Sequence, residues 1–449
     1  MAGMVVKNNM SAINTLNTLN KNHGALSKSL QKVSSGMKIN SAADDASGYA
    51  ISERMRVQIR SLDQDNKNTQ NGSALMKVAE GAVQSTVDIL KTLKEKVINA
   101  ANDTNTDSDR SQIQKELNQS IDQVNDNANV TYNGKYLVDG THNSKGNVTQ
   151  THMTNQSLAT TTDANTKLTQ LANRVGDSLH INSEDKVTVS FVNEGKTYTT
   201  TMSVGSNTIS QILTTATSYA HSAAGGSAAA TVGVKVVDST GFSATIGTDK
   251  FGKTIKTADG TNAVTVQALA TGVGNQIAGL TISITDKNGN INKSANAALD
   301  AFNETIRAEQ ASDDNSIVLQ TGTKANQAIK IGLTDMRAQA LGLQGADGTT
   351  LNIETQKNAN AAINVLDNAI QKALDQQTTI GAIESRLEYT STNLTTASEN
   401  VQASESTIRD ADMAKEMTEY TKNNVLLQAA QSMLAQANQN SSSVLSLLQ

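Results

Sequence analysis

Two adjacent carboxylates are the side chains in this sequence that most resemble a catalytic group. Asp44 and Asp45 are of the residue type that enzymes use in pairs for general acid and base catalysis. They also follow Ser41 at the start of a helical pattern, in the order of a capping box: the Ser41 hydroxyl would accept from the free N–H groups of the helix N-terminus, while Asp44 and Asp45 lie at the positive end of the helix dipole. We expect this capping role, because it explains both carboxylates without a substrate.

Histidine spacing and the absence of cysteine argue against metal and thiol chemistry. The five histidines lack the spacing of metal ligands, and no HExxH motif occurs; they are His23, His142, His152, His180 and His221. The chain has no cysteine, which excludes disulfides, thiol catalysis and cysteine-bound metals. We therefore expect neither an enzyme nor a bound cofactor.

Composition favours long helices. The 449 residues include no proline, and only 2% are aromatic, so helices can run unbroken and the core must come from Ala, Leu, Ile, Val and Met. A net charge of -5 with mixed signs predicts no nucleic-acid partner. The sequence has no apolar run long enough for a membrane span, and its N-terminus lacks the pattern of a secretory signal peptide.

Both ends of the chain carry apolar residues in alternating steps of three and four, the pattern of a helix that packs against another helix. The predicted assembly seam consists of Leu16, Leu19, Leu26, Leu30, Val33, Met413, Met417, Leu427, Leu434, Leu445 and Leu448. Polar residues interrupt it at Asn424, Gln431 and Asn438, and we expect these to set register. With so incomplete a core, we expect both ends to be disordered in the isolated subunit and to fold on polymerisation.

The remaining pattern predicts a mainly α fold with long terminal coiled-coil helices, a helical-bundle stalk with a β-hairpin, and an inserted α+β outer domain. Helices are expected over 4–37, from the Ser41–Asp44 cap to about 102, and over 107–129 and 353–409. Asn133-Gly134 predicts a type I′ hairpin, and 316–333 a pair of strands. In the insertion we expect strands at 187–192, 197–204 and 280–285 and helical pieces at 208–219 and 294–308. The predicted domains are 1–40 with 410–449, 41–164 with 316–409, and 165–315.

Two long motifs, one near each end, resemble those of bacterial flagellins. They occupy residues 30–60 and, on the C-terminal side, 387–390, 408–417 and 433–439, and the resemblance covers about 1–140 and 316–449. It implies an extracellular structural subunit that forms a helical homo-polymer, with the terminal helices as an inner tube and the insertion facing solvent. It also implies unfolded export by the flagellar type III apparatus, with an export chaperone and a filament cap as partners, and folding at the filament tip.

The resemblance also suggests contact residues. Inter-subunit ion pairs are expected among Arg54, Arg56, Arg60, Arg386 and Arg409, although such arginines can also be solvated surface charges. The family suggests recognition by Toll-like receptor 5, and the matching region contains Leu90, Leu93, Lys94, Glu95, Glu116 and Gln119. Thr92 and Ser120 stand where strongly recognised flagellins have arginines, and Lys96 where they have a leucine, so we expect weak recognition.

Two other functions fit parts of the pattern. A hook–filament junction protein would share the terminal helices. A surface adhesin would use residues 165–315 to bind a ligand and the helical ends as an anchor.

Overall fold

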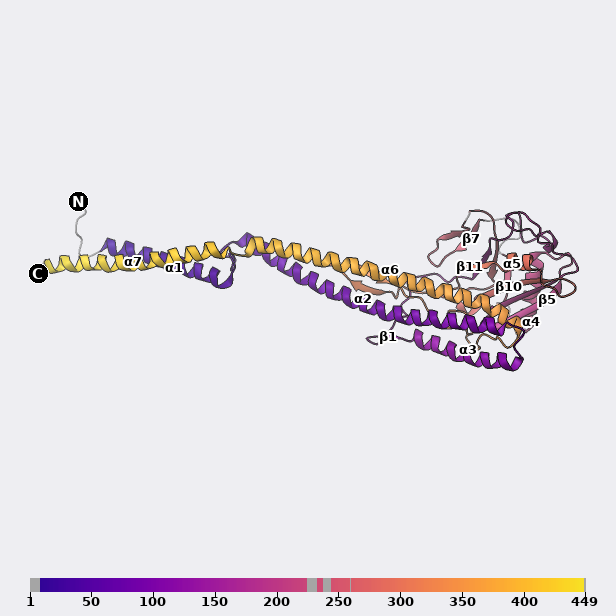
Figure 1. Cartoon of the computed structure of the whole chain (residues 1–449). Coiled ribbons are helices and arrows are strands. Elements are labelled where there is room, and N and C mark those ends of the chain that lie inside the picture. The colour runs from indigo at the N-terminus through magenta and orange to yellow at the C-terminus, as the bar shows by residue number, and fades with distance from the viewer. Residues whose placement is uncertain (1–8, 224–231, 237–243, 259, 448–449) are drawn as a thin grey trace. The chain divides into compact units, whose positions relative to one another are not determined.

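The computed structural model describes residues 9–223, 232–236, 244–258 and 260–447. The chain forms two compact units, which we call the end unit (Met1–Gln70, Gln320–Gln327 and Tyr389–Gln449) and the middle unit (Asn71–Leu319 and Ala328–Glu388). Long helices dominate, and most strands fall in one stretch of the middle unit (Figure 1). This confirms the predicted mainly α fold with an inserted α+β part.

Two terminal helices, α1 (Met10–Ser35) and α7 (Met413–Leu447), lie side by side in the end unit (Figure 1). They are antiparallel, because Asn9 Nδ2 donates to the Ala437 carbonyl at 3.1 Å while Lys32 Nζ lies 3.4 Å from Glu416 Oε1. The predicted N-terminal helix is confirmed in its described part; residues 4–8 lie outside the described residues. The end unit also takes 46–70 of α2 (Ala46–Ala100) and 389–409 of α6 (Gln356–Arg409).

The start of α2 differs from the prediction in its capping residue. Asp45 is the cap, since its Oδ1 accepts a hydrogen bond from Gly48 N at 3.0 Å. Asp44 Oδ2 instead accepts from the backbone N–H groups of Asn40 and Ser41 and from the Ser41 hydroxyl, so it closes the preceding turn. The hydrogen bond from Ser41 N lowers the pKa of Asp44. The prediction of Ser41 as the cap was therefore wrong, because α2 begins a few residues further along the chain than a helix capped by Ser41 would.

The helical part of the middle unit packs α2, α3 (Asp107–Ala128) and α6 around one aliphatic core. Leu90, Leu117, Ile121, Leu366 and Ile380 belong to this core and are almost completely buried. Two short strand pairs accompany it, β1 (Thr131–Tyr132) with β2 (Lys135–Tyr136) and β12 (Ile317–Gln320) with β13 (Ala328–Ile331).

The predicted type I′ hairpin is confirmed between β1 and β2. Asn133 and Gly134 have φ angles of 50° and 76°, the two left-handed positions that this turn requires.

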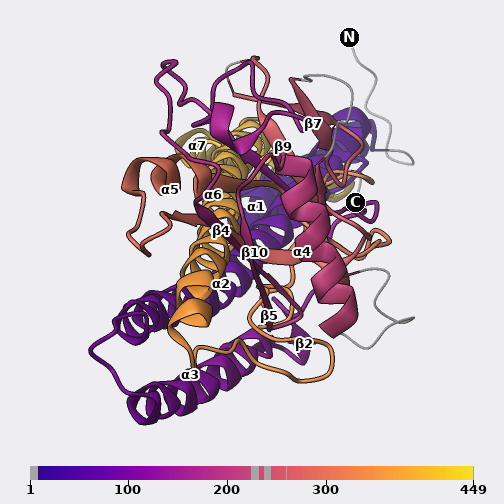
Figure 2. The same cartoon turned by 90° about the vertical axis from the view of Figure 1, so that its right-hand side faces the viewer.

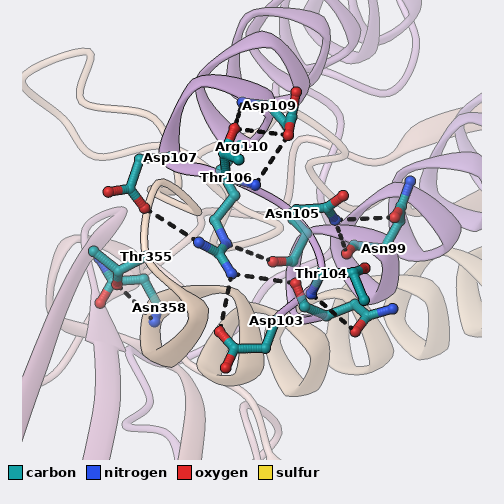
Figure 3. A network of polar contacts seen from close by, with 12 residues as sticks. Asn99, Asp103, Thr104, Asn105, Thr106, Asp107, Asp109, Arg110, Thr355 and Asn358 are labelled. Carbon is teal, nitrogen blue, oxygen red and sulfur yellow. Dashed lines mark hydrogen bonds and ion pairs between the residues drawn. The ribbon is translucent and has the colours of Figure 1, made fainter.

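A buried arginine holds the turn between α2 and α3 (Figure 3). Arg110 Nε donates to the Ala100 carbonyl at 3.0 Å, and its Nη2 donates to the Asn102 carbonyl at 3.2 Å. Thr106 and Asp109 form a capping box at the start of α3. The guanidinium thus gives the Ala100 carbonyl at the end of α2 a donor, and it is a second donor to the Asn102 carbonyl, which also accepts from Asn105 N at 3.3 Å.

The α+β part of the middle unit contains two principal sheets (Figure 2). The three-stranded sheet has the order β10-β4-β5, and the four-stranded sheet has the order β11-β3-β9-β6. Their strands are β3 (His152–Asn155), β4 (Lys186–Asn193), β5 (Lys196–Ser203), β6 (Val234–Val236), β9 (Val264–Ala268), β10 (Ile277–Thr285) and β11 (Phe302–Ile306). The other elements are a hairpin of β7 (Thr245–Thr248) and β8 (Thr254–Lys256), helices α4 (Ile209–Ala223) and α5 (Lys293–Leu299), and 3₁₀ turns η1 (Leu168–Gln170) and η3 (Val273–Asn275).

The three predicted strands of the insertion are confirmed as β4, β5 and β10, and the first helical piece as α4. The prediction of a second helical piece at 294–308 was wrong over its latter half. Helix α5 ends at Leu299, and Phe302–Ile306 forms β11, which pairs with β3. That pairing joins segments far apart in the chain and overrides the local helical pattern. Strand β3 itself precedes residue 165, where the insertion was predicted to begin.

Candidate functional site

The contact between α1 and α7 forms a narrow seam. On α1 the positions with reduced exposure include Ala12, Thr15, Leu19, Asn22, Leu26, Ser29 and Val33. On α7 they include Glu416, Tyr420, Asn423, Leu427, Ala430, Leu434 and Ala437. Both sets repeat in steps of three and four, so the seam is a heptad contact that mixes small, polar and apolar side chains.

Hydrogen bonds run along this seam. Asn22 Nδ2 donates to the Leu426 carbonyl at 3.2 Å, and Asn423 Nδ2 donates to Ser29 Oγ at 3.0 Å. These polar contacts align the two helices in one register but bury little apolar area.

The predicted assembly seam divides between this contact and the exposed surface. Five of its members, Leu19, Leu26, Val33, Leu427 and Leu434, are partly buried in the α1–α7 seam. Four others are exposed, namely Leu16, Leu30, Met413 and Met417. Leu445 belongs to α7 but its side chain is not described, and Leu448 lies outside the described residues.

Both terminal helices therefore keep apolar side chains on their surface. We call them the exposed apolar set: Met10, Ile13, Leu16 and Leu30 on α1, and Met413, Met417, Val425, Leu426 and Met433 on α7. Part of the set lines a shallow groove of about 590 Å³ on α7. Successive helical residues are about 100° apart, so Met417 and Met433 lie roughly 160° from each other around α7. The set therefore covers more than one face of the helix.

A buried arginine closes the joint where the helices of the end unit meet. The Arg409 side chain is buried, and its Nη1 donates to Glu53 Oε1 at 2.6 Å. Its Nε lies 3.2 Å from the Met37 sulfur, and its guanidinium carbon lies 5.5 Å from the centre of the Tyr49 ring. The hydrogen bond from Arg409 lowers the pKa of the Glu53 carboxyl.

Backbone contacts complete the joint. Lys38 N donates to the Arg409 carbonyl at 2.7 Å, and Ala411 N donates to the Gly36 carbonyl at 2.9 Å. Gly36 has a φ of 71°, the left-handed conformation that ends α1. The joint therefore ties the end of α1 to the link between α6 and α7.

The arginines proposed for inter-subunit contact have different surroundings. Arg409 was wrongly placed on that surface, because its guanidinium is buried and paired within the chain. Arg56 pairs with Glu53 at 3.2 Å and is half-buried, while Arg54, Arg60 and Arg386 are exposed. Glu53 and Tyr49 were not predicted as partners, because a contact with a residue more than 350 positions away has no local sequence pattern.

The region proposed for receptor contact contains both buried and exposed residues. Leu90 and Leu93 are core residues with no more than 1% exposure, so they were wrong as surface contacts. Glu95, Glu116 and Gln119 are exposed, and Lys94 pairs with Asp367. A groove of about 520 Å³ lies beside them and includes Thr92 and Ser120 in its lining. Each of these two hydroxyls donates to a carbonyl of its own helix.

No catalytic arrangement emerges from the carboxylates and histidines singled out in the sequence. Asp44 and Asp45 accept hydrogen bonds from the local backbone, as described above. Within the described ranges, no group of three or more His, Cys, Asp or Glu residues is placed to hold a metal ion. In the same ranges, no helix is both long and apolar enough to cross a membrane.

Comparison with known proteins assigns both helical ends to one family. Residues 6–143 match the bacterial flagellin N-terminal helical region, and residues 363–448 match the bacterial flagellin C-terminal helical region. The chain is 33% identical over 439 residues to a flagellin of Clostridium tyrobutyricum, covering 97% of this chain and 99% of the relative. It is 32% identical over 465 residues to a flagellin of Bacillus subtilis (strain 168), covering 99% and 100%.

A third relative is the flagellar filament 33 kDa core protein of Treponema phagedenis, which is 28% identical over 446 residues, covering 99% of this chain and 100% of the relative. With both helical regions matched and relatives aligned over nearly the whole length, the chain belongs to the bacterial flagellin family and is a structural subunit of the flagellar filament, a homo-polymer.

Proposed function

We propose that the exposed apolar set on α1 and α7 is the surface through which copies of this chain pack into the filament. The observation that carries this proposal is the division of apolar side chains between an internal seam and a second, exposed set on the same helices. Exposed apolar residues grouped in this way mark contact surfaces. Because the set covers more than one face, each subunit meets several neighbours.

The test is a substitution on the exposed set with a matched neighbour as its control. Leu16→Glu places a charge where we propose a buried contact, and Asn14→Glu places the same charge two residues away on the exposed surface of α1. Burial of a leucine side chain stabilises a contact by about 1.5–3 kcal/mol, so Leu16→Glu should raise the critical concentration for seeded polymerisation about tenfold or more. Electron microscopy and sedimentation measure it. Equal critical concentrations for the two variants would contradict the proposal.

We propose that the ends complete their folding when they assemble. The α1–α7 seam contains Asn22, Ser29 and Asn423 and leaves its leucines only partly buried. Ordering a residue costs about 1–2 kcal/mol, which so little apolar burial does not offset without neighbouring subunits. Circular dichroism should show more helix in filaments than in free subunits. Equal helicity in the two states would count against this step.

We propose that the chain is exported unfolded by the flagellar type III apparatus, with an export chaperone and a filament cap as partners. Folding that is completed only on assembly is consistent with this route. The chain has no cysteine and no proline, so neither disulfide formation nor slow prolyl isomerisation delays refolding at the tip. Secretion into the medium should stop when the flagellar export gate is deleted. Unchanged secretion in that strain would exclude this route.

Among host proteins, Toll-like receptor 5 is the expected partner, and we propose that it recognises this chain weakly. The exposed candidates are Glu95, Glu116 and Gln119, beside a groove that Thr92 and Ser120 line with small side chains. The double variant Thr92→Arg/Ser120→Arg adds guanidinium donors there and should lower the half-maximal concentration in a cell reporter roughly tenfold. Gln112→Arg, exposed on α3, is the charge control. A reporter response of the parent chain equal to that of a strong flagellin would refute weak recognition.

A further inference from the structure

The methionines of this chain are unevenly exposed. Met10, Met413, Met417 and Met433 are 60%, 43%, 46% and 62% exposed, and all four lie on α1 or α7. In the middle unit, Met76, Met153 and Met336 are at most 2% exposed. Met37, Met55 and Met202 are partly buried. Among the described residues, every methionine that is more than two-fifths exposed therefore belongs to the exposed apolar set.

Exposure controls how readily a methionine thioether is oxidised. A peroxide transfers one oxygen atom to the sulfur as its O–O bond breaks, so that the sulfur is oxidised by two electrons and hydrogen peroxide leaves as water. The product is a sulfoxide, a polar group on a side chain that was apolar. The side chain keeps its length, but it can then be buried in a dry contact only if the new oxygen finds a donor.

We propose that Met10, Met413, Met417 and Met433 are a modification site for peroxides, at which sulfoxide formation in the free subunit blocks filament assembly. This inference rests on the proposed packing of the exposed apolar set between subunits. Sulfoxides at these positions place polar oxygens at several points of one contact surface. The middle unit keeps its structure, because its own methionines are in the core or partly covered.

The four methionines should be exposed to peroxide to different extents in the free subunit and in the filament. In the free subunit the four sulfurs are open to solvent, whereas in the filament the neighbouring copies cover them. Assembly therefore protects the four methionines, and oxidation before assembly removes the subunit from the polymerising pool.

The experiment treats the full-length chain with hydrogen peroxide, once as free subunits and once as filaments, and stops the reaction with catalase. Peptide mass spectrometry then measures sulfoxide at each methionine, with Met1 and Met4, outside the described residues, counted separately. We expect the four sites to oxidise first in free subunits and to be protected in filaments. The oxidised subunits should show a critical concentration for seeded polymerisation at least about tenfold higher, and a methionine sulfoxide reductase should restore it.

Two variants identify which sulfurs matter. In the chain carrying Met10→Leu, Met413→Leu, Met417→Leu and Met433→Leu, no sulfur remains at the proposed site, and leucine is similar in volume. Each chain is compared with its own unoxidised sample, so any effect of leucine on assembly cancels. The quadruple variant should lose its sensitivity to peroxide. Met202→Leu, a partly buried position of the middle unit, should keep the full sensitivity of the parent.

The outcomes are distinct. Oxidised parent subunits that polymerise at an unchanged critical concentration overturn the inference, as does a quadruple variant that remains sensitive. A loss of circular dichroism or of cooperative thermal unfolding in the oxidised subunit also overturns it, because the block is then general unfolding. Failure of the unoxidised chain to polymerise refutes the proposed packing itself and is seen before any peroxide is added.

Discussion

Replacing Asp300 by asparagine should stabilise the middle unit at neutral pH. Asp300 follows α5, and Asn364 Nδ2 of helix α6 donates to its Oδ1 at 3.0 Å. Burial raises the pKa of its carboxyl from 3.8 to about 6, although the hydrogen bond from Asn364 acts in the opposite direction. The folded state therefore disfavours the charged carboxylate.

Proton linkage gives the sign and the size of the effect of Asp300 on stability. Because the pKa of Asp300 is raised in the folded state, its contribution to the free energy of unfolding is fully present below pH 3.8 and is lost as the pH rises through about 6. At about 1.4 kcal/mol per pKa unit, and discounted for the remaining solvent contact, the loss is about 2–3 kcal/mol. Asparagine carries no charge and can still accept from Asn364, so Asp300→Asn removes this loss.

Urea unfolding followed by circular dichroism, at pH values from below 3.8 to above 6, measures the difference. The parent should lose stability relative to Asp300→Asn across this range, and carboxyl NMR should follow the titration of Asp300 directly. Asp122→Asn, at an exposed position of α3, is the matched control and should leave the pH dependence unchanged. If the curves of the parent and Asp300→Asn are parallel, the assigned burial effect is wrong.

Two further substitutions probe the buried arginines. Arg110→Leu leaves the Ala100 carbonyl without its donor and removes one of the two donors to the Asn102 carbonyl, so it should destabilise the middle unit by about 1–3 kcal/mol in thermal unfolding. An equal melting temperature would show that the turn does not depend on the guanidinium. Arg409→Met removes the hydrogen bond from Arg409 to Glu53, so the pKa of the Glu53 carboxyl should rise in an NMR titration and polymerisation should weaken. An unchanged pKa of Glu53 would refute the pairing.

The sequence alone was sufficient for several features that depend only on neighbouring residues. The Asn133-Gly134 turn is of this kind, since both residues must adopt positive φ and these residue types do so readily. Helix α3 is another, because a capping box, an apolar face and a turn signal all lie within its own stretch of chain. The family motifs at the two ends are likewise read directly from residue order. The predicted domain boundaries, by contrast, remain predictions.

Only the tertiary structure decided which face of each helix meets a partner. Leu16 and Leu19 fit the same heptad pattern, yet Leu19 enters the seam with α7 and Leu16 stays exposed, because spacing defines a stripe but not the neighbour that covers it. Arg409 and Glu53, like strands β3 and β11, are joined by chain reversals that bring distant segments together. Local sequence patterns do not predict such pairings, because the free energy of a pairing comes from contacts that exist only after the chain has folded.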